Sequence, residues 1–229
     1  MYEFPFELDD FQKDACKCIS DGQSVVVCAP TGAGKTVIAQ HAIHCALEKG
    51  QRVFYTTPLK ALSNQKFSDF SEKYGADKVG LLTGDTSFNR GAQIVVMTTE
   101  VFRNMLYGTN FGSVSDNLKD VKYVILDEVH YMNDEQRGTV WEESIIYCPT
   151  NVQIIALSAT VANADKLTEW INTVHSKTEL INTDFRPVPL RFFYFDSSQP
   201  NTILPLLTPS GALNNKIKPE KKQFKRGKP

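Results

Sequence analysis

The sequence predicts an α/β domain that contains a predominantly parallel sheet with helices on both faces. Short apolar runs rich in Val and Ile alternate with segments of helical periodicity, which is the order of strands and helices in such domains. The runs are apolar at nearly every position, as expected of parallel strands that are buried on both faces. Polar motifs follow the ends of several runs, where ligands bind in sheets of this kind.

The expected elements alternate along the chain. A helix over 10–20 precedes the first strand and stops at Asp21-Gly22. We expect Thr57 to cap the third helix with Pro58 at its first position, and Thr98 and Thr99 to cap the fourth. The expected strands are 24–28, 52–56, 79–82, 93–97, 123–126 and 152–157, and the later helices are 35–49, 58–74, 100–107, 141–147 and 164–174.

Composition and charge limit the classes of function. The chain has 229 residues, of which 41% are hydrophobic, and this suits one large globular domain. A net charge of -1 excludes a domain-wide basic field, so any contact with nucleic acid has to be local. The five cysteines form no Cys-x-x-Cys pair, which argues against a zinc site and favours a reducing compartment such as the cytoplasm. No apolar window is long enough for a transmembrane helix, so no membrane partner is expected.

A glycine-rich turn that ends in Lys-Thr predicts a phosphate-binding loop between the first strand and the second helix. Backbone N–H groups of such a loop converge on a phosphate, the Lys35 ammonium reaches β and γ oxygens, and the Thr36 hydroxyl ligates Mg²⁺. The N-terminus of the following helix adds free N–H groups and a favourable dipole. The loop residues are Ala29, Pro30, Thr31, Gly32, Ala33, Gly34, Lys35 and Thr36.

Two adjacent carboxylates follow the apolar run 123–126, where a P-loop fold needs its second Mg²⁺ element. Asp127 would hold the metal, and Glu128 would orient or deprotonate the attacking water. The alternative is a solvated acidic turn, which the upstream loop disfavours. Ser158, Ala159 and Thr160 end another strand, where small hydroxyl residues could also be simple helix caps.

Two other groups of residues leave two interpretations open. Gln12 lies three residues after Asp9, and this spacing favours a capping box over a contact with adenine. His41, His44 and Cys45 lie close together on one helix, but no further ligand cluster supports a metal site there.

These motifs together resemble superfamily 2 helicases of the DExH type. Residues 29–36, 127–130 and 158–160 match helicase motifs I, II and III in order and at fitting separations, residues 57–66 look like motif Ia, residues 83–85 and 98–100 look like motifs Ib and Ic, and Phe11-Gln12 looks like the Q-motif. Arg137-Gly138, residues 141–143 and residues 186–190 are similar to the superkiller-like branch of RNA helicases, and to its cyanobacterial and plastid members in particular. The resemblance covers about residues 4–207.

The resemblance implies a RecA-like fold, ATP and Mg²⁺ as ligands, and RNA as partner, with DNA as the other possibility. It makes Gln12 an adenine contact rather than only a cap. His130 and the Ser158-Ala159-Thr160 motif would couple the nucleotide state to the strand. The expected nucleic-acid contacts are Thr57, Pro58, Lys60, Thr83, Gly84, Asp85, Thr98, Thr99 and Arg103. Backbone N–H groups at the two helix starts would hold phosphates without reading base sequence.

The resemblance also sets the expected domain organisation. We expect a RecA-like domain over residues 1–195 and a linker or disordered basic tail over 196–229. The family's motifs IV to VI, which belong to a second RecA-like domain, have no counterpart in this sequence. The alternative functions are a nucleotide-gated binding module without hydrolysis of its own and the lobe of a DNA helicase. A plastid stroma is the alternative compartment.

Overall fold

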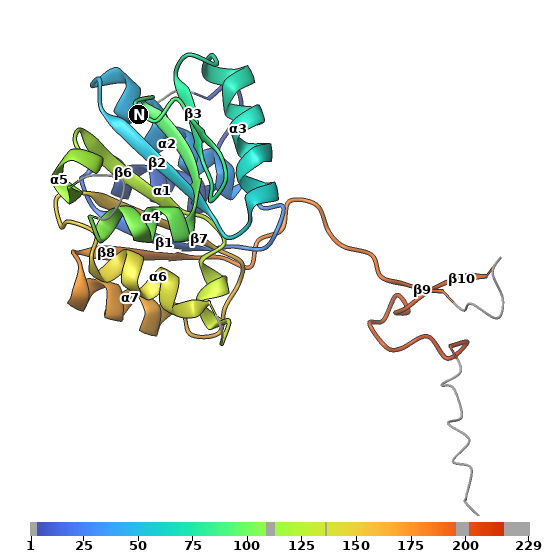
Figure 1. Cartoon of the computed structure of the whole chain (residues 1–229). Helices are drawn as coiled ribbons and strands as arrows, with labels where there is room; N and C mark the ends of the chain where they lie inside the picture. Colours follow the sequence, from blue (N-terminus) through green and yellow to red (C-terminus); the bar gives the residue numbers. More distant parts are fainter. Residues whose placement is uncertain (1–3, 109–112, 136, 196–201, 218–229) are drawn as a thin grey trace, which may run out of the picture. The chain divides into compact units, whose positions relative to one another are not determined.

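A computed structural model describes residues 4–108, 113–135, 137–195 and 202–217 of the chain. The chain divides into two compact units, Met1–Arg186 and Pro187–Pro229. The first unit contains the large sheet and its helices (Figure 1). In the part of the chain that the structure describes, no helix is both long and apolar enough to span a bilayer.

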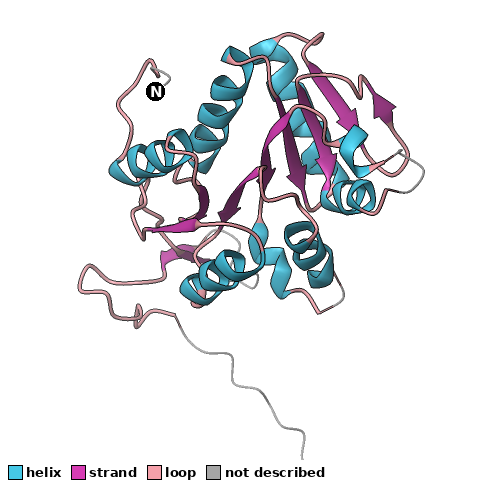
Figure 2. Cartoon of the chain, turned by 90° about the vertical axis from the view of Figure 1, so that its left-hand side faces the viewer, coloured by secondary structure: helices cyan, strands magenta, loops and turns pink. Residues whose placement is uncertain are grey.

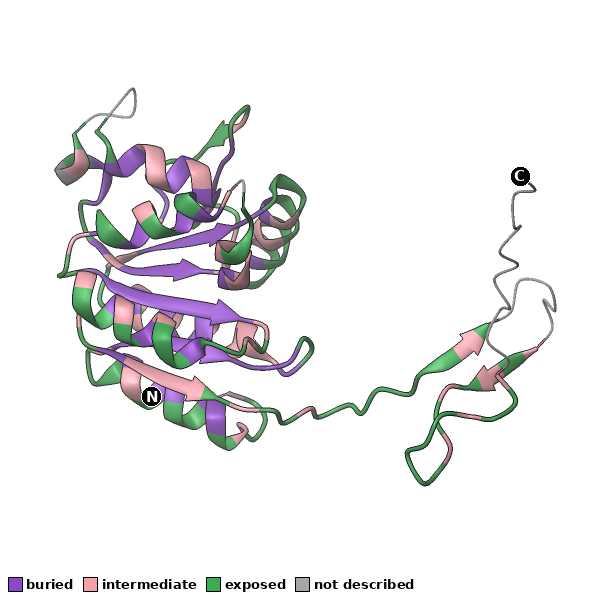
Figure 3. Cartoon of the chain, turned by 90° about the horizontal axis from the view of Figure 1, so that it is seen from below, coloured by how far each residue is buried: buried purple, intermediate pink, exposed green. Residues whose placement is uncertain are grey.

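Eight strands form the sheet of the first unit, in the order β4-β3-β5-β2-β6-β7-β1-β8. β4 is antiparallel to β3, and every other neighbouring pair is parallel. Four strands, β1, β3, β5 and β7, are buried over their whole length, and β2 and β6 are buried at all but one residue, which explains their continuous apolar sequence (Figure 3). Their bounds are β1 Ser24–Cys28, β2 Arg52–Thr57, β3 Val79–Leu82, β4 Ser87–Phe88, β5 Ile94–Thr98, β6 Val121–Leu126, β7 Gln153–Ser158 and β8 Thr178–Asn182.

Helices cover both faces of this sheet (Figure 2). Val25 and Val27 of β1 contribute to the core on the side of α1, α2 and α3, whereas Val26 contributes to the core on the side of α4, α6 and α7, where Trp141 is fully buried. The bounds are α1 Asp10–Ser20, α2 Lys35–Glu48, α3 Lys60–Tyr74, α4 Thr99–Leu106, α5 Val114–Asn117, the 3₁₀ helix η1 Val129–Asn133, α6 Gly138–Ile146 and α7 Ala164–Val174. The predicted fold class is therefore confirmed.

The strands agree with the sequence prediction better than some helix starts do. All six predicted strands are present, with ends that differ by at most two residues. The two edge strands β4 and β8 were not predicted. β4 has only two residues, and β8 is partly exposed, so neither gives the continuous apolar signal of a buried strand. α4 begins at Thr99, one residue earlier than predicted, with Thr98 as its N-cap.

The predicted start of α3 is wrong. Thr57 is the last residue of β2, because its backbone still pairs with Thr98 of β5. Leu59 takes extended backbone angles, with φ at -135° and ψ at 138°, and the helix begins at Lys60. The Thr57 side chain nevertheless ties this turn together, since its hydroxyl lies 2.8 Å from the Ser63 hydroxyl and 3.0 Å from the Leu59 carbonyl oxygen.

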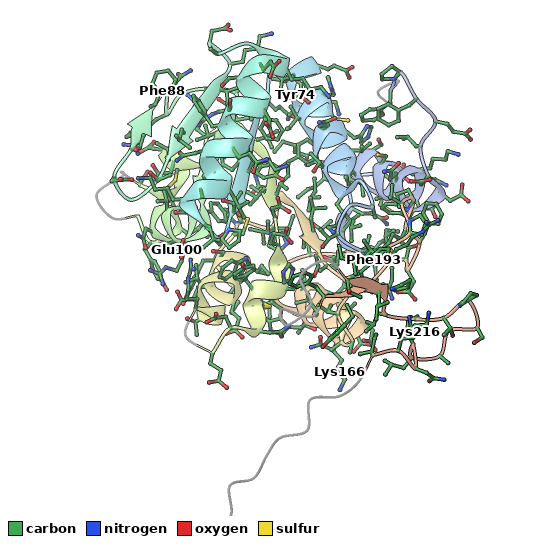
Figure 4. All side chains as sticks on the ribbon, turned by 90° about the vertical axis from the view of Figure 1, so that its right-hand side faces the viewer. Tyr74, Phe88, Glu100, Lys166, Phe193 and Lys216 are labelled. Carbon is green, nitrogen blue, oxygen red and sulfur yellow. The ribbon has the colours of Figure 1, made fainter. Side chains whose placement is uncertain are left out.

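The second unit contains a short antiparallel pair of strands. β9 spans Phe193–Phe195 and β10 spans Ile203–Pro205, and a single bridge joins Leu207 to Leu213. β10 lies inside the segment that was predicted to be a linker. Most of the basic residues predicted in the tail fall outside the described residues, and Lys216 is described (Figure 4). The predicted domain boundary at residue 195 stays a prediction.

Candidate nucleotide and nucleic-acid sites

The glycine-rich loop connects the buried strand β1 to the start of α2. Gly34 takes a left-handed conformation with φ at 87°, and a Cβ atom at this position would lie 2.7 Å from the Gln12 side-chain nitrogen. Glycine meets both demands, because it adopts positive φ without strain and leaves room for the neighbouring side chain. α2 begins at the next residue, so the free N–H groups of its first turn point toward the loop, where they can bind an anion.

Lys35 lies across its own loop. Its Nζ donates to the carbonyl oxygens of Ala29 at 2.8 Å and Pro30 at 3.2 Å. Burial lowers the pKa of this ammonium, and the nearby carboxylates of Glu128 and Asp127 act in the opposite direction. Phosphate oxygens are charged acceptors and would form stronger bonds with the ammonium than these neutral carbonyl groups do.

Asp127 and Glu128 lie beyond the end of β6, beside the loop. The Tyr55 hydroxyl donates to Asp127 Oδ2 at 2.6 Å, and the Glu128 backbone N–H donates to Asp127 Oδ1 at 3.0 Å. Burial, followed by the charge of Asp127, raises the pKa of Tyr55 well above its usual value, so this hydroxyl remains a donor. Glu128 has a φ of 56°, which is rare for a residue with a side chain and typical of functional positions.

One cavity of about 360 Å³ joins the loop to these carboxylates. It is lined by Thr31, Gly32, Gly34, Lys35, Thr36, Leu62, Gln65, Lys66, Asp127 and Glu128. The hydroxyl of Thr36 and the carboxylate of Asp127 both line it and supply the hard oxygen ligands that Mg²⁺ prefers. Among the described residues no group of three or more His, Cys, Asp and Glu side chains could hold a metal. The two protein oxygens suit Mg²⁺, which keeps several waters and is usually bound by one or two protein ligands together with substrate phosphates.

Gln12 makes both the predicted capping contact and a contact with the phosphate loop. Its Oε1 accepts from the Asp9 backbone N–H at 2.9 Å, and its Nε2 donates to the carbonyls of Ala33 at 3.4 Å and Gly34 at 3.3 Å. The side chain is almost fully buried, so it links the start of α1 to the phosphate loop. Within the described part of the chain, His41 and His44 join no group of three or more possible metal ligands, and His41 Nε2 lies 3.0 Å from the Ser20 hydroxyl.

The Ser158-Ala159-Thr160 segment meets the two other motifs at the end of β7. The Ala29 N–H donates to the Ser158 carbonyl at 3.2 Å, and the Ala159 N–H donates to His130 Nδ1 at 3.3 Å. The same His130 nitrogen lies 3.4 Å from the Glu128 carboxylate. His130 therefore lies between the acidic motif and this segment, while the neighbouring Thr160 is exposed.

The predicted nucleic-acid contacts gather at the carboxyl ends of three adjacent strands, β3, β5 and β2. The Thr99 hydroxyl donates to the Thr57 carbonyl at 3.1 Å, which joins the start of α4 to the end of β2. Lys60 forms an ion pair with Asp85, whose carboxylate also accepts from the Thr83 hydroxyl. Pro58, Gly84 and Thr98 complete this edge, at the ends of the same strands.

Arg103 is placed differently from the other predicted contacts. Its guanidinium lies 3.5 Å from the Glu143 carboxylate of α6 and donates to the Asn104 side-chain oxygen. Its guanidinium therefore faces the neighbouring helix α6.

Sequence reasoning gave no role at these sites to four residues, although three of them lie within the motifs that carry the resemblance. They are Tyr55, which holds Asp127; Lys66, whose Nζ lies 3.5 Å from the Thr36 hydroxyl; Arg186, which donates to the Thr31 carbonyl at 2.9 Å; and Arg137, which donates to the Pro58 carbonyl at 2.7 Å. A tyrosine within an apolar strand was the available signal for the first, since a buried hydroxyl needs a partner. The other three contacts join segments that are distant in sequence, so no local pattern could reveal them.

Comparison with solved structures agrees with the fold. The helicase Lhr of Mycobacterium smegmatis, solved with single-stranded DNA and AMP-PNP, matches with a TM-score of 0.60 and 27% identity over 76% of this chain and 25% of that one. The helicase MrfA, bound to DNA and AMPPNP, matches with a TM-score of 0.65 at 23% identity over 80% of this chain and 28% of that one. The second likeness concerns the fold alone.

Comparison with protein sequences identifies the family. The chloroplastic DExH-box ATP-dependent RNA helicase DExH15 of Arabidopsis thaliana is 53% identical over 93% of this chain and 18% of its own length. The probable helicase HelY of Mycobacterium tuberculosis is 54% identical over 82% and 20%, and the human exosome RNA helicase MTR4 is 48% identical over 84% and 18%. This chain thus spans about a fifth of these relatives. The DEAD/DEAH box helicase family model matches residues 9–167, and the chain therefore belongs to that family.

Proposed function

We propose that this chain is the ATP-binding lobe of an ATP-dependent RNA helicase of the DExH type. The observation that carries the proposal is the single cavity that brings the phosphate loop together with Asp127 and Glu128. Phosphoryl transfer from ATP needs a cationic cradle for the phosphates, oxygen ligands for a metal and a group that orients water, and residues suited to each of these roles line this cavity.

The proposed roles follow from the contacts of each side chain. Lys35 exchanges its two carbonyl partners for phosphate oxygens when ATP binds. Thr36 and Asp127 would hold Mg²⁺, and the Tyr55 hydroxyl fixes the Asp127 carboxylate in place. When bound, Mg²⁺ neutralises charge that develops on the phosphates. Glu128 orients the attacking water.

The nucleic-acid side of the proposal rests on the edge formed by β3, β5 and β2. N–H groups at the starts of α3 and α4 would hold successive phosphates, and Lys60 would exchange its Asp85 partner for a phosphate. RNA is proposed as the partner because two sequence relatives, DExH15 and MTR4, are named RNA helicases. The two solved structures described above contain DNA, which keeps a DNA helicase as the alternative. His130 links the acidic motif to the Ser158-Ala159-Thr160 segment and is proposed to transmit the nucleotide state.

The compartment and the domain partner belong to the proposal as well. Five cysteines without disulfides support a reducing compartment, the cytoplasm or, by the name of DExH15, a plastid stroma. Because the chain spans about a fifth of its relatives, we propose that a second RecA-like domain completes the ATP site in the working enzyme.

The experiment that tests the proposal measures binding of a fluorescent ATP analogue and of a labelled single-stranded RNA to the 229-residue chain. We expect both to bind, with binding of the ATP analogue dependent on Mg²⁺. Failure to bind any nucleotide would refute the proposal. Binding of DNA with higher affinity than RNA would favour the lobe of a DNA helicase, and binding without hydrolysis in a longer, two-lobed chain would favour the nucleotide-gated module.

A further inference from the structure

Arg137 joins three segments of the first unit that are distant in sequence. Its guanidinium Nη2 donates to the Pro58 carbonyl oxygen at 2.7 Å and forms an ion pair with the Glu100 carboxylate. Pro58 follows β2, and Glu100 lies in the first turn of α4 (Figure 4). The Arg137 backbone N–H donates to Asp134 Oδ1 at 3.1 Å, just after the 3₁₀ helix that follows the acidic motif.

Backbone hydrogen bonds join the segment after Glu128 to the start of α6. The Tyr131 N–H donates to the Glu128 carbonyl at 3.0 Å, and the Gly138 N–H donates to the Asp134 carbonyl at 2.8 Å. A Cβ atom at Gly138 would lie 2.2 Å from the Met132 carbonyl oxygen, so only glycine allows this approach. The position of the arginine is thereby tied to the ATP side of the domain.

The bond to Pro58 fixes the direction of one peptide plane. The described residues contain no cis peptide bond, and in a trans peptide the C=O and N–H groups point in opposite directions. Because the Pro58 carbonyl points at Arg137, the Leu59 N–H of the same peptide points away from it. Leu59 is the N-cap of α3. The bond from Arg137 to Pro58 therefore orients the first free N–H group of that helix.

The ion pair acts at the start of the neighbouring helix. Glu100 is acidic and lies in the first turn of α4, beside N–H groups that we propose to bind phosphate. Arg137 and Glu100 each expose about a third of their side chains, 36% and 33%. Both bonds come from the same nitrogen, Nη2, at the end of a side chain that is one atom longer than that of lysine, so the carbonyl and the carboxylate meet at one point that a lysine ammonium does not reach in the same way.

We propose that Arg137 is a positioning residue that holds the starts of α3 and α4 in the mutual geometry needed to grip a nucleic-acid backbone, and that it ties both to the segment after Glu128. This inference rests on the proposed function and adds a residue to it. Arg137 itself does not contact the strand. Loss of Arg137 therefore weakens the contacts that uncharged N–H groups of α3 and α4 make with phosphate. It removes no charged contact with phosphate, which would depend on salt.

The test measures the affinity of the 229-residue chain for labelled single-stranded RNA by fluorescence anisotropy at several salt concentrations. Arg137→Ala is expected to weaken binding roughly fivefold to tenfold, on the scale of one or two lost hydrogen bonds. The slope of log affinity against log salt should stay unchanged, and affinity for an ATP analogue should stay as in the unmodified chain. Lys60→Ala is the contrasting variant. Loss of one phosphate contact on a single strand should make the negative slope shallower by about 0.7.

Two variants separate positioning from simple charge neutralisation. Glu100→Gln keeps the bond from Arg137 to Pro58 and should bind RNA at least as well as the unmodified chain. The double variant Arg137→Ala/Glu100→Ala has the charge balance of the unmodified chain and should stay as weak as Arg137→Ala. Recovery of full affinity in the double variant would show that Arg137 only neutralises Glu100, and would overturn the inference.

Other outcomes are equally decisive. If the negative salt slope became shallower by about 0.7 in Arg137→Ala, the arginine would contact phosphate directly, which contradicts a positioning role. If Arg137→Ala does not fold, Arg137→Lys keeps the charge on a shorter side chain without a guanidinium and should still weaken RNA binding about threefold or more. Affinity equal to that of the unmodified chain would refute the inference. Unmodified chain that binds neither RNA nor ATP analogue would refute the proposed function and this inference with it, whereas normal binding by every variant would refute this inference alone.

Discussion

Replacement of Lys35 by alanine tests the phosphate loop most sharply. In the ligand-free loop the ammonium donates to two carbonyl oxygens, at 2.8 and 3.2 Å, and burial lowers its pKa. ATP would replace these neutral partners by charged oxygens, and a hydrogen bond between charged groups contributes roughly 1.5 to 3 kcal/mol. Because each 1.4 kcal/mol of binding free energy changes the dissociation constant about tenfold, Lys35→Ala should weaken ATP binding by about tenfold to a hundredfold.

The assay is a titration of the chain with a fluorescent ATP analogue in Mg²⁺. Lys73→Ala is a matched control, because this lysine of α3 donates to Gln40 at 2.7 Å and does not line the cavity. The control should bind the analogue as tightly as the unmodified chain. Thermal unfolding should show that both variants are folded. Equal affinity for the analogue in Lys35→Ala and in the control would refute the assignment of the phosphate cradle.

The remaining predictions concern stability, pH and unwinding. Tyr55→Phe removes the buried donor to Asp127 and should lower the free energy of unfolding in urea by about 1 to 3 kcal/mol; an unchanged midpoint would contradict this. Gly138→Ala should lower it by about 1 to 3 kcal/mol, whereas Gly91→Ala, with nothing within 4 Å, should change it by less than about 0.5. Affinity for ATP should fall as alkaline pH deprotonates Lys35, at a lower pH than for an exposed lysine; a flat profile would count against it. The chain alone should not separate a tailed RNA duplex in a strand-displacement assay with ATP, because an arginine from a second domain is typically worth ~10³ to 10⁵ in rate.

Sequence patterns were sufficient to predict the sheet, since its central strands are buried on both faces and leave a continuous apolar signal. They also predicted that the phosphate loop and the acidic motif follow β1 and β6, because both motifs are local runs of residues. Sequence patterns did not predict the start of α3 correctly. Thr57 and Pro58 have the residue types of a helix cap, but pairing of Thr57 with Thr98 extends the strand, and such pairing is a long-range contact.

The contacts that hold the site together could not be read from the sequence for the same reason. Tyr55 and Asp127 are 72 residues apart, and Arg137 and Pro58 are 79 residues apart. Gln12 shows a related difficulty, because its capping contact and its contact with the phosphate loop occur together in one side chain. Spacing suggested either a capping box or a contact with adenine. The structure contains the capping contact with Asp9, and the same side chain also bonds the Gly34 carbonyl of the phosphate loop.

The central claim is that the phosphate loop and the two carboxylates form one Mg²⁺-dependent ATP site. The most direct test compares binding of a fluorescent ATP analogue with Mg²⁺ and with excess EDTA in the unmodified chain, Asp127→Asn and Glu128→Gln. We predict that Asp127→Asn loses the Mg²⁺-dependent part of the affinity, since it removes a metal ligand, and that Glu128→Gln keeps it, since this residue acts on water. If Asp127→Asn retained the full effect of Mg²⁺, the metal would lie elsewhere and the claim would be contradicted.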